Sequence, residues 1–433
     1  MTTRTDHEDA HAGRLQGGDG YSFDVDHVAV IGASLAGVRA CGGLRANGFG
    51  GTITLVGAET HSPYDRPPLS KKVLAGEWEP DRIALFRPTD VETMRLDLRL
   101  GSPAAALSLD HRAVTLADGS ILPFDGLIIA TGAATRKLAD QPVDDSVFEL
   151  RTLDDSLALR ARLGVGGQRV TIIGAGFIGL EVAATARQLG NEVLVLEGLP
   201  APLIRGLGAE MGRAVTTLHD DNGVPIRCGV SVRGIVRDDD GLTVHIGDGR
   251  GNTEALASDV VVVGIGVSPA TGWLEGSGLD LRDGIVCDST LNAGPPGVYA
   301  AGDVARWPNP QFADEEMRVE HWTNASEQGL HAAKNLLAVA NDDAPTPYSA
   351  VPFFWSEQYG VRIQFVGRAA GDDDVRIVRG SIESRSFLAL YGKHGVLRGA
   401  LGMAMPKPLM QSRTFLLDGL TFDEAIEAAA SLA

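Results

Sequence analysis

The chain of 433 residues has few cysteines and no long apolar run. Its three cysteines, Cys41, Cys228 and Cys287, lie far apart and form no CxxC pair, so we predict a reduced, cytoplasmic protein without a metal site. No run of about 18 uncharged apolar residues occurs, so the sequence predicts no membrane span.

Basic residues are also in deficit. The chain holds 38 Lys and Arg against 56 Asp and Glu, and its net charge of −18 argues against binding to nucleic acid or anionic lipid. The polar residues 1–24 lack the apolar core of a secretory signal, so we expect a disordered N-terminal extension there.

What is present is a repeated pattern of apolar strands and glycine turns. Residues 27–59 and 169–197 each read as strand, glycine turn, helix and strand, with continuous apolar strands typical of parallel sheets covered on both faces. Shorter apolar strands ending in glycine follow at 127–132, 260–266 and 297–303. The length and this pattern predict an α/β protein with two doubly wound, Rossmann-like dinucleotide-binding domains.

The chain changes character after residue 345, where the aromatic stretch "FFWSEQYGVRIQFVG" precedes further strand-like segments. We therefore predict a C-terminal α+β domain, joined through the acidic linker "NDDAPTP" at 341–347.

Both glycine turns sit where a dinucleotide fingerprint requires them, between a buried strand and a helix. The second turn is intact, with Gly174, Gly176 and Gly179, whereas the first has Ser34 between Gly32 and Gly37. Free N–H groups at the start of each helix would bind a pyrophosphate.

An acidic residue ends the strand after each turn, and we expect Glu59 and Glu197 to bind ribose hydroxyls. A carboxylate at Glu197 disfavours a 2′-phosphate, and no arginine follows before Arg205, so NADH is predicted rather than NADPH. Two phosphate-free structural turns are the alternative interpretation.

Glu181 lies where the second turn becomes a helix. It could be an acid that complements the helix dipole, or it could pair with a cation. The segment "YDRPPLSKK" offers Arg66 and Lys71 for such a pair, although this segment could equally be a surface turn.

Eight motifs in order carry a resemblance to a known family: "GASLAG", "YDRPPLSK", "ATGAATR", "IGAGFIGLE", "GIGVSP", "YAAGDVA", "RVEHWTNASEQG" and "PFFWSEQY". From about residue 26 onward the chain resembles the FAD-dependent, NADH-using ferredoxin reductases of bacterial oxygenase systems, the putidaredoxin reductase and rhodocoxin reductase type. These belong to the pyridine nucleotide–disulfide oxidoreductase superfamily.

The resemblance implies a site for each cofactor. The residues implied for non-covalent FAD are Gly32, Ser34, Gly37, Glu59, Arg66, Lys71, Ala104, Thr131, Gly132, Arg136, Gly302, Asp303, Trp322 and Trp355. Those implied for NADH are Gly174, Gly176, Gly179, Glu181, Glu197, Gly264, Gly266 and Glu320. It further implies a catalytic ion pair of Lys71 with Glu181 near flavin N5. Ala201 stands where relatives often place an arginine, and Phe353 stands in place of a tryptophan.

The resemblance also implies a domain order. The expected order is an extension at 1–24, an FAD-binding domain at 25–132 and 267–345, an NAD-binding domain at 133–266, and a C-terminal reductase domain at 346–433.

The expected reaction passes electrons from NADH through FAD to a 2Fe–2S ferredoxin that serves an oxygenase. Disulfide reductases of the superfamily use a CxxxxC pair, which this chain lacks, so electrons would leave directly from the flavin. The alternatives are a rubredoxin reductase, a flavin-only NADH oxidase and, from another class, a redox-responsive binding protein of the apoptosis-inducing-factor type.

We expect the ferredoxin to dock partly on the C-terminal domain. Residues 361–413 hold nine basic residues against four acidic ones, reversing the overall sign of the chain. The alternative is that these charges are spread over a solvated surface.

Overall fold

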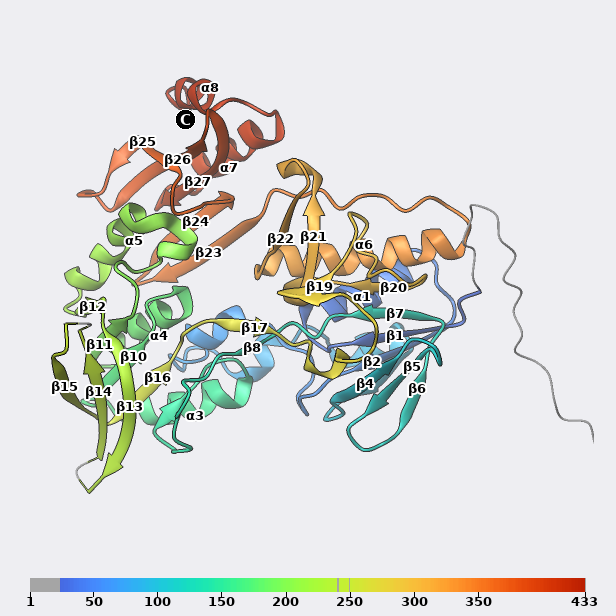
Figure 1. Cartoon of the computed structure of the whole chain (residues 1–433), viewed down its shortest axis with the longest axis horizontal. Helices are drawn as coiled ribbons and strands as arrows, with labels where there is room; N and C mark the ends of the chain where they lie inside the picture. Colours follow the sequence, from blue (N-terminus) through green and yellow to red (C-terminus); the bar gives the residue numbers. More distant parts are fainter. Residues whose placement is uncertain (1–23, 240, 249, 433) are drawn as a thin grey trace, which may run out of the picture.

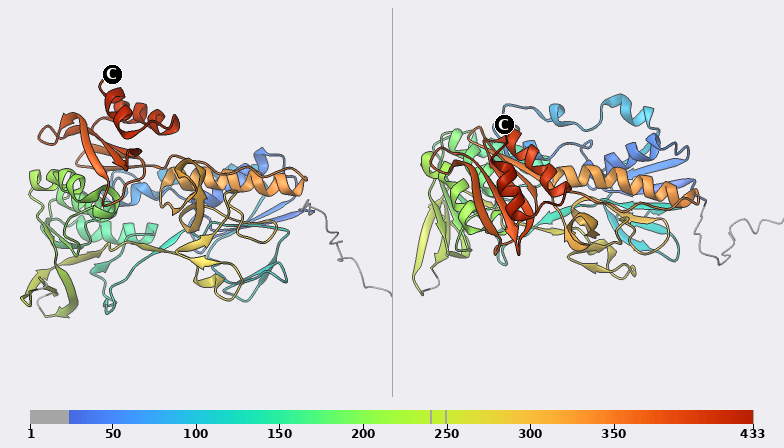
Figure 2. Two further views of the ribbon diagram at one scale, coloured as in Figure 1. Left: turned by 45° about the horizontal axis from the view of Figure 1, so that its top comes forward. Right: turned by 90° about the horizontal axis from the view of Figure 1, so that it is seen from above.

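The computed structural model describes residues 24–239, 241–248 and 250–432. The extension expected at 1–24 therefore lies outside the described residues, except for Asp24. Figure 1 shows two α/β units side by side, with the C-terminal segment standing over the second unit. The views in Figure 2 agree with this arrangement. No helix in the described part of the chain is long and apolar enough to cross a membrane.

The first unit is built on a parallel sheet with the strand order β20-β7-β1-β2-β3. Its strands are β1 (His27–Ile31), β2 (Thr52–Val56), β3 (Leu96–Arg99), β7 (Gly126–Ile129) and β20 (Val298–Ala300). The apolar run of β1 is fully enclosed, since Val28, Ala29 and Val30 are inaccessible to solvent. The helices α1 (Leu35–Ala46) and α6 (Trp322–Ala340) pack against each other beside this sheet.

The second unit repeats the plan with the order β12-β11-β10-β16-β9, again all parallel. Its strands are β9 (Val147–Phe148), β10 (Arg169–Ile173), β11 (Glu192–Glu197), β12 (Ile226–Cys228) and β16 (Val260–Val263). Its helices are α3 (Leu153–Leu163), α4 (Phe177–Gln188) and α5 (Ile204–Asp221). The two doubly wound units expected from the repeated pattern are confirmed, because β1 and β10 hold equivalent central positions.

Smaller elements decorate and join these units. One is the short helix α2 (Pro88–Thr93). Two are three-stranded antiparallel sheets: the first consists of β4 (Ala104–Ser108), β5 (Ala113–Leu116) and β6 (Ile121–Pro123), and the second of β13 (Ser231–Asp238), β14 (Gly241–Gly247) and β15 (Thr253–Ser258). The last is a mixed sheet of β18 (Leu281–Arg282), β19 (Gly284–Val286), β21 (Ala305–Asn309) and β22 (Glu315–Arg318). The paired strands β8 (Ala133–Thr135) and β17 (Val267–Pro269) run between the two units (Figure 1).

The C-terminal segment forms an antiparallel sheet with the order β23-β24-β27-β26-β25. Its strands are β23 (Phe353–Gln358), β24 (Val361–Gly367), β25 (Asp374–Ser381), β26 (Ser386–Lys393) and β27 (Val396–Met403), and the helices α7 (Pro406–Leu417) and α8 (Phe422–Ala429) pack on it. An α+β character is thereby confirmed for this segment.

The C-terminal sheet shares a hydrophobic core with the second unit. Phe365, Phe387 and Tyr391 belong to one cluster with Leu207 and Met211 of α5. The Tyr391 hydroxyl also donates to the Leu207 carbonyl at 2.9 Å. A common core of this kind holds the C-terminal sheet firmly against the second unit. The domain boundaries expected at 132/133, 266/267 and 345/346 stay a prediction.

Candidate functional site

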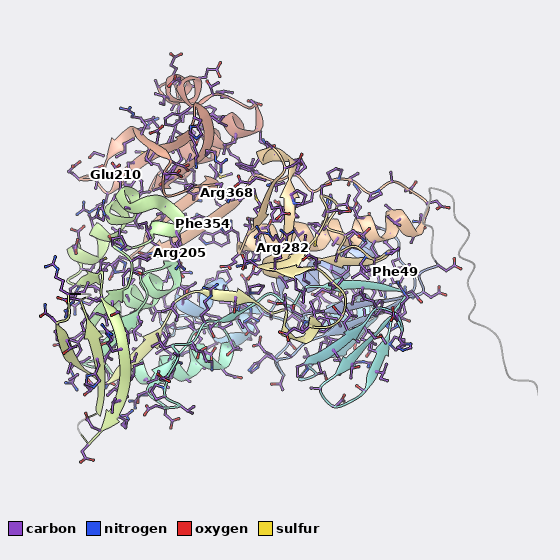
Figure 3. The ribbon with its side chains drawn as sticks, viewed as in Figure 1. Phe49, Arg205, Glu210, Arg282, Phe354 and Arg368 are labelled. Carbon is purple, nitrogen blue, oxygen red and sulfur yellow. The ribbon has the colours of Figure 1, made fainter. Side chains whose placement is uncertain are left out.

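One large cavity, about 1200 Å³ in volume, lies where the two parallel units and the C-terminal sheet meet. Arg205, Phe354 and Arg368, which line it, lie close together in Figure 3 although they come from α5, β23 and the end of β24. All but four of the site residues expected from the sequence line this cavity; the exceptions are Gly32, Gly37, Glu59 and Ala104. Segments far apart in the chain thus converge on one space large enough for extended ligands.

In the second glycine turn, packing requires two of the three glycines, whereas the third has open space in front of it. A Cβ at Gly174 would lie 2.3 Å from the Gly264 carbonyl oxygen, and one at Gly179 would lie 2.2 Å from the Gly174 carbonyl oxygen. Gly174 also has a φ of +106°, which disfavours any other residue. A Cβ at Gly176 would meet nothing within 4 Å. The space in front of Gly176, at the start of α4, is therefore free for a ligand's phosphate.

In the first turn, too, packing requires the outer glycines but not the residue between them. A Cβ at Gly32 would lie 2.1 Å from the Ala130 carbonyl oxygen, and one at Gly37 would lie 1.9 Å from the Gly32 carbonyl oxygen. Ser34, the N-cap of α1, lines the cavity and its hydroxyl makes no capping hydrogen bond. The residues that close the turn are thus outside the cavity, while the helix start faces it. Ala104 lies in β4 and does not line the cavity.

Glu197 ends β11 with its carboxylate tied to the backbone. It accepts hydrogen bonds from the N–H groups of Ala175 and Leu199, both at 2.8 Å. Because Ala175 lies inside the second glycine turn, the carboxylate is fixed beside that turn. Ala201 also lines the cavity and is almost fully buried.

Glu59 is held by the segment after it. Arg66 donates to its carboxylate at 2.7 Å, and the Tyr64 hydroxyl donates at 2.5 Å. Arg66 also donates to the Arg151 carbonyl at 2.5 Å, so "YDRPPLSKK" is an internal clamp and not a surface turn. Within it, η1 (Pro67–Ser70) is a short 3₁₀ turn that begins at two prolines and places Lys71 at the cavity.

Lys71 and Glu181 form a nearly buried ion pair. Lys71 Nζ lies 2.6 Å from Glu181 Oε2, and the two side chains are 17% and 3% exposed. The Ser70 hydroxyl donates to the same oxygen at 2.5 Å, and the Ser356 hydroxyl donates to Oε1 at 2.7 Å. The interpretation of Glu181 as a dipole-complementing acid is wrong, because the first turn of α4 holds no acidic residue and Glu181 faces a cation instead.

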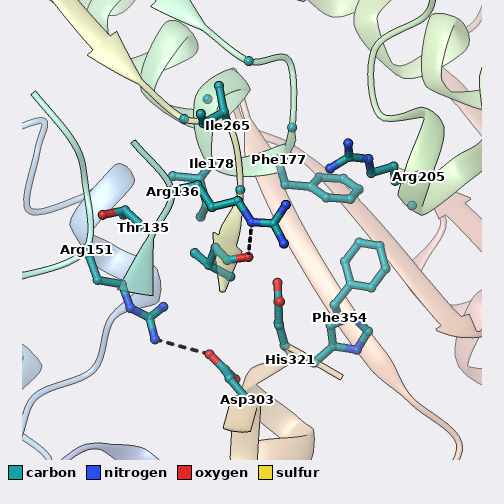
Figure 4. A pocket seen from close by; sticks show the side chains of 18 of the residues that line it. Thr135, Arg136, Arg151, Phe177, Ile178, Arg205, Ile265, Asp303, His321 and Phe354 are labelled. Carbon is teal, nitrogen blue, oxygen red and sulfur yellow. Dashed lines mark hydrogen bonds and ion pairs between the residues drawn. The ribbon is translucent and has the colours of Figure 1, made fainter. Parts of the chain in front are cut away.

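Asp303 and the two expected tryptophans line the cavity and make contacts that the sequence did not predict. Arg151 donates to Asp303 at 3.3 Å, as the dashed line in Figure 4 shows, and burial lowers the pKa of Arg151. The Trp322 indole N–H donates to Asp65 at 2.7 Å. Trp355 packs edge-on against Trp322, with ring centroids 5.9 Å apart.

Three further expected residues are anchored around the cavity. The Thr131 hydroxyl donates to the Ala270 carbonyl at 3.0 Å, and Arg136 Nε donates to the Val267 carbonyl at 2.9 Å. Glu320 accepts from Arg318 at 2.6 Å, and Arg318 also reaches Asp283 at 3.1 Å. Gly132, Gly264, Gly266 and Gly302 complete the lining at the ends of strands.

Several lining residues were missed from the sequence, above all Arg151, Phe177, His321 and Phe354. Figure 4 shows Phe177 and Phe354 next to each other beside Arg205. The two rings pack edge-on, and their centroids are 4.8 Å apart. Strand alternation does not identify Phe354, because it places neighbouring side chains on opposite faces, whereas both Phe354 and Trp355 line the cavity. Nothing in the sequence connects Arg151 with Asp303, 152 residues away.

The cysteines take no part in this cavity. All three are free thiols among the described residues, and none lines the cavity. Burial raises the pKa of Cys41 and of Cys287 to about 12, which keeps both thiols protonated and unreactive.

Residues 26–329 match the pyridine nucleotide-disulphide oxidoreductase family, and residues 353–432 match the reductase C-terminal family. The chain belongs to the pyridine nucleotide-disulphide oxidoreductase family. Rhodocoxin reductase of Rhodococcus erythropolis is 36% identical over 396 residues, covering 90% of this chain and 89% of that protein.

Two further proteins are similar to this chain over most of their length. The ferredoxin–NAD(+) reductase component of the p-cumate 2,3-dioxygenase system of Pseudomonas putida is 38% identical over 360 residues, covering 82% of this chain and 84% of that protein. The crystal structure of the covalent putidaredoxin reductase–putidaredoxin complex matches with a TM-score of 0.86 and 31% identity, covering 94% of this chain and 100% of that chain.

Proposed function

We propose that this protein is an FAD-dependent NADH:ferredoxin reductase, passing electrons from NADH to a 2Fe–2S ferredoxin that serves an oxygenase. The observation that carries the proposal is the single cavity reached by both dinucleotide turns. One turn alone would fit any dinucleotide enzyme, whereas two turns opening into one space fit the direct transfer of electrons between two cofactors. The ferredoxin reductases named above agree with this assignment.

The residues around the first turn fit FAD. The Ser34 hydroxyl, which makes no capping hydrogen bond, and the N–H groups at the start of α1 offer donors for a pyrophosphate. Glu59 offers a carboxylate for ribose hydroxyls. The further residues proposed for FAD are Gly32, Gly37, Arg66, Lys71, Ala104, Thr131, Gly132, Arg136, Gly302, Asp303, Trp322 and Trp355.

The residues around the second turn fit NADH. Gly176 leaves space for a pyrophosphate at the start of α4, and Glu197 is fixed beside it with a charge that repels a 2′-phosphate. The further residues proposed for NADH are Gly174, Gly179, Glu181, Gly264, Gly266 and Glu320.

A bound flavin would supply the redox chemistry, by accepting a hydride and releasing electrons one at a time. The protein supplies binding, orientation and charge. Lys71 and Glu181 place a fixed, nearly neutral pair at the cavity, and the edge-on aromatic rings of Phe177 and Phe354 form an apolar part of its lining. Since none of the described cysteines lines the cavity, no thiol is placed to relay electrons. A one-electron acceptor that meets the flavin directly fits this arrangement.

The ferredoxin is proposed to dock partly on the C-terminal domain. Four of the nine basic residues in 361–413 are engaged in ion pairs: Arg368, Arg385, Lys393 and Arg398. Four others are exposed, lie in none of the ion pairs of the described residues, and so are available to act on a partner's charge: Arg376 of β25, Arg362, Arg379 and Lys407. We further propose the domain boundaries given above and a cytoplasmic location, which suits three free thiols.

The test is steady-state reduction by NADH of a panel of purified ferredoxins and rubredoxins. We expect the protein to bind one FAD non-covalently and to turn over fastest with a 2Fe–2S ferredoxin. Faster rubredoxin reduction would favour a rubredoxin reductase, and oxygen consumption without any acceptor would favour an NADH oxidase. A long-lived reduced complex without turnover would favour a redox-responsive binding protein.

A further inference from the structure

A continuous chain of hydrogen bonds, three of them buried and the last partly buried, runs from the Lys71–Glu181 pair into the C-terminal domain. Ser356 Oγ lies 2.7 Å from Glu181 Oε1, and Gln358 Nε2 lies 3.1 Å from Ser356 Oγ. His219 Nε2 lies 2.9 Å from Gln358 Oε1, and the Tyr359 hydroxyl lies 3.3 Å from His219 Nδ1. We call these four residues, Tyr359, His219, Gln358 and Ser356, the hydrogen-bond chain.

The chain joins all three parts of the fold. Glu181 comes from α4 and His219 from α5, both in the second unit. Ser356 and Gln358 alternate on β23, so both point to the same side of the C-terminal sheet, toward α4 and α5. Lys71 follows η1 in the first unit. The pair therefore has its full set of contacts only when the three parts are packed together.

The direction of every hydrogen bond in the chain follows from the carboxylate. An ionised carboxylate only accepts, so Ser356 must donate to Glu181 and must itself accept from the Gln358 amide N–H₂. The Gln358 carbonyl oxygen then accepts from His219 Nε2–H, which leaves Nδ1 of a neutral ring to accept from Tyr359. All four donors thus point toward Glu181.

The environment of the chain supports this direction. His219, Ser356 and Gln358 are at most 1% exposed, so water does not compete for their hydrogen bonds. Burial lowers the pKa of His219, which favours the neutral ring that the direction requires. Aligned hydrogen bonds in a buried chain strengthen one another, so the effect at Glu181 exceeds that of the Ser356 hydroxyl alone.

We propose that Ser356, Gln358, His219 and Tyr359 are positioning residues, which hold the Glu181 carboxylate in place beside Lys71 and thereby tune the flavin that the cavity binds. This inference rests on the proposed function. It assigns the C-terminal domain a second role besides docking, because β23 supplies Ser356, which donates to Glu181, and Gln358, which donates to Ser356.

The test compares Ser356→Ala with Ser412→Ala. Ser412 of α7 is a matched control, because it is a buried serine of the same domain whose hydroxyl bonds only to helix carbonyls. The measurements are the flavin midpoint potential, the limiting rate of flavin reduction by NADH, and the urea midpoint of unfolding. A purely structural role would lower the urea midpoint in both variants and leave the potential unchanged.

We expect Ser356→Ala to slow flavin reduction about tenfold, as the loss of a hydrogen bond to a charged group implies. The potential should also change, because a Glu181 carboxylate that loses the Ser356 donor is held less firmly beside Lys71, which alters the charge arrangement at the cavity. A tenfold change in the redox balance corresponds to about 30 mV for a two-electron couple. Ser356→Thr keeps the hydroxyl and should restore both values.

Gln358→Met breaks the chain one step further away and should shift both values in the same direction by a smaller amount. This variant also decides the matter if Ser356→Ala does not fold. Potentials and rates equal to those of Ser412→Ala in both chain variants would overturn the inference while leaving the proposed function intact. A wild-type protein that binds no FAD, or whose flavin NADH does not reduce, would overturn the proposed function and this inference with it.

Discussion

Removing the partners of the Lys71–Glu181 pair one at a time tests the centre of the site. The structure predicts unequal costs for the two single variants. Lys71→Met leaves a carboxylate that is 3% exposed, whereas Glu181→Gln leaves an ammonium that is 17% exposed at the edge of the cavity. The more deeply buried charge has less access to water, so stranding it should cost more.

The magnitudes follow from the contacts. Breaking a buried pair typically costs about 3–5 kcal/mol in unfolding free energy. Glu181 keeps the hydroxyl donors of Ser70 and Ser356 after Lys71→Met, so we expect the lower end, about 3 kcal/mol. For Glu181→Gln we expect about 2 kcal/mol, the loss of one hydrogen bond to a charged group. Because each change removes the same contact, the double variant should cost about 3 kcal/mol and not the sum of the two, so the coupling is about 2 kcal/mol.

The assay is urea unfolding at a fixed excess of FAD, combined with stopped-flow reduction of the flavin by NADH. Lys72→Met is the matched control, because the neighbouring Lys72 makes an ion pair with Glu77 in which the side chains are 40% and 55% exposed. We expect it to cost under about 1 kcal/mol and to leave flavin reduction unchanged. Strictly additive costs for Lys71→Met and Glu181→Gln, with unchanged reduction rates in both, would refute the assigned role of the pair.

Three further outcomes are expected. Glu197→Gln keeps an acceptor for the Ala175 N–H but removes the charge. The preference for NADH over NADPH, measured as the ratio of the two kcat/KM values, should therefore narrow about tenfold. A wild-type protein that prefers NADPH would contradict this reasoning. Burial lowers the pKa of His321 to about 4, and the unfolded ring binds its proton below about 6.5, so stability should rise with pH across that window. His321→Phe should flatten this slope in urea unfolding, whereas replacing the exposed His111 by Phe should not. Reduction of ferredoxin should slow with rising salt, while reduction of a small neutral quinone barely changes. Arg376→Glu should raise the KM for ferredoxin but not the KM for NADH. Ferredoxin reduction that depends neither on salt nor on Arg376→Glu would place docking elsewhere.

The two parallel units were predictable because their signal is local. Each unit needs only a buried apolar strand, a glycine turn and a helix within about thirty residues, and the sequence shows all three. For the C-terminal domain only the α+β class could be predicted. The strand order of its sheet depends on pairings between strands, which the sequence does not show.

The contacts of the site were harder to foresee, because they join distant segments. Lys71 and Glu181 are separated by 110 residues, and their pairing came from a resemblance and not from spacing. The partner of Asp303 is Arg151, and no feature of the sequence around Arg151 distinguishes it from a surface arginine. Ser356 and Glu181 are 175 residues apart, and strand alternation places Ser356 on the face of β23 opposite Trp355 without indicating its partner.

The two glycine turns show why the fingerprint can vary at one position only. The outer glycines are required by packing, since a Cβ at Gly32, Gly37, Gly174 or Gly179 would lie about 2 Å from a backbone oxygen. The middle position is open, because a Cβ at Gly176 would meet nothing within 4 Å. Ser34 holds the equivalent N-cap position of α1, so its side chain fits without moving the turn, and its unused hydroxyl faces the cavity. Packing therefore does not require glycine at the middle position. A serine there keeps the backbone N–H groups at the start of the helix and adds a hydroxyl that makes no capping hydrogen bond.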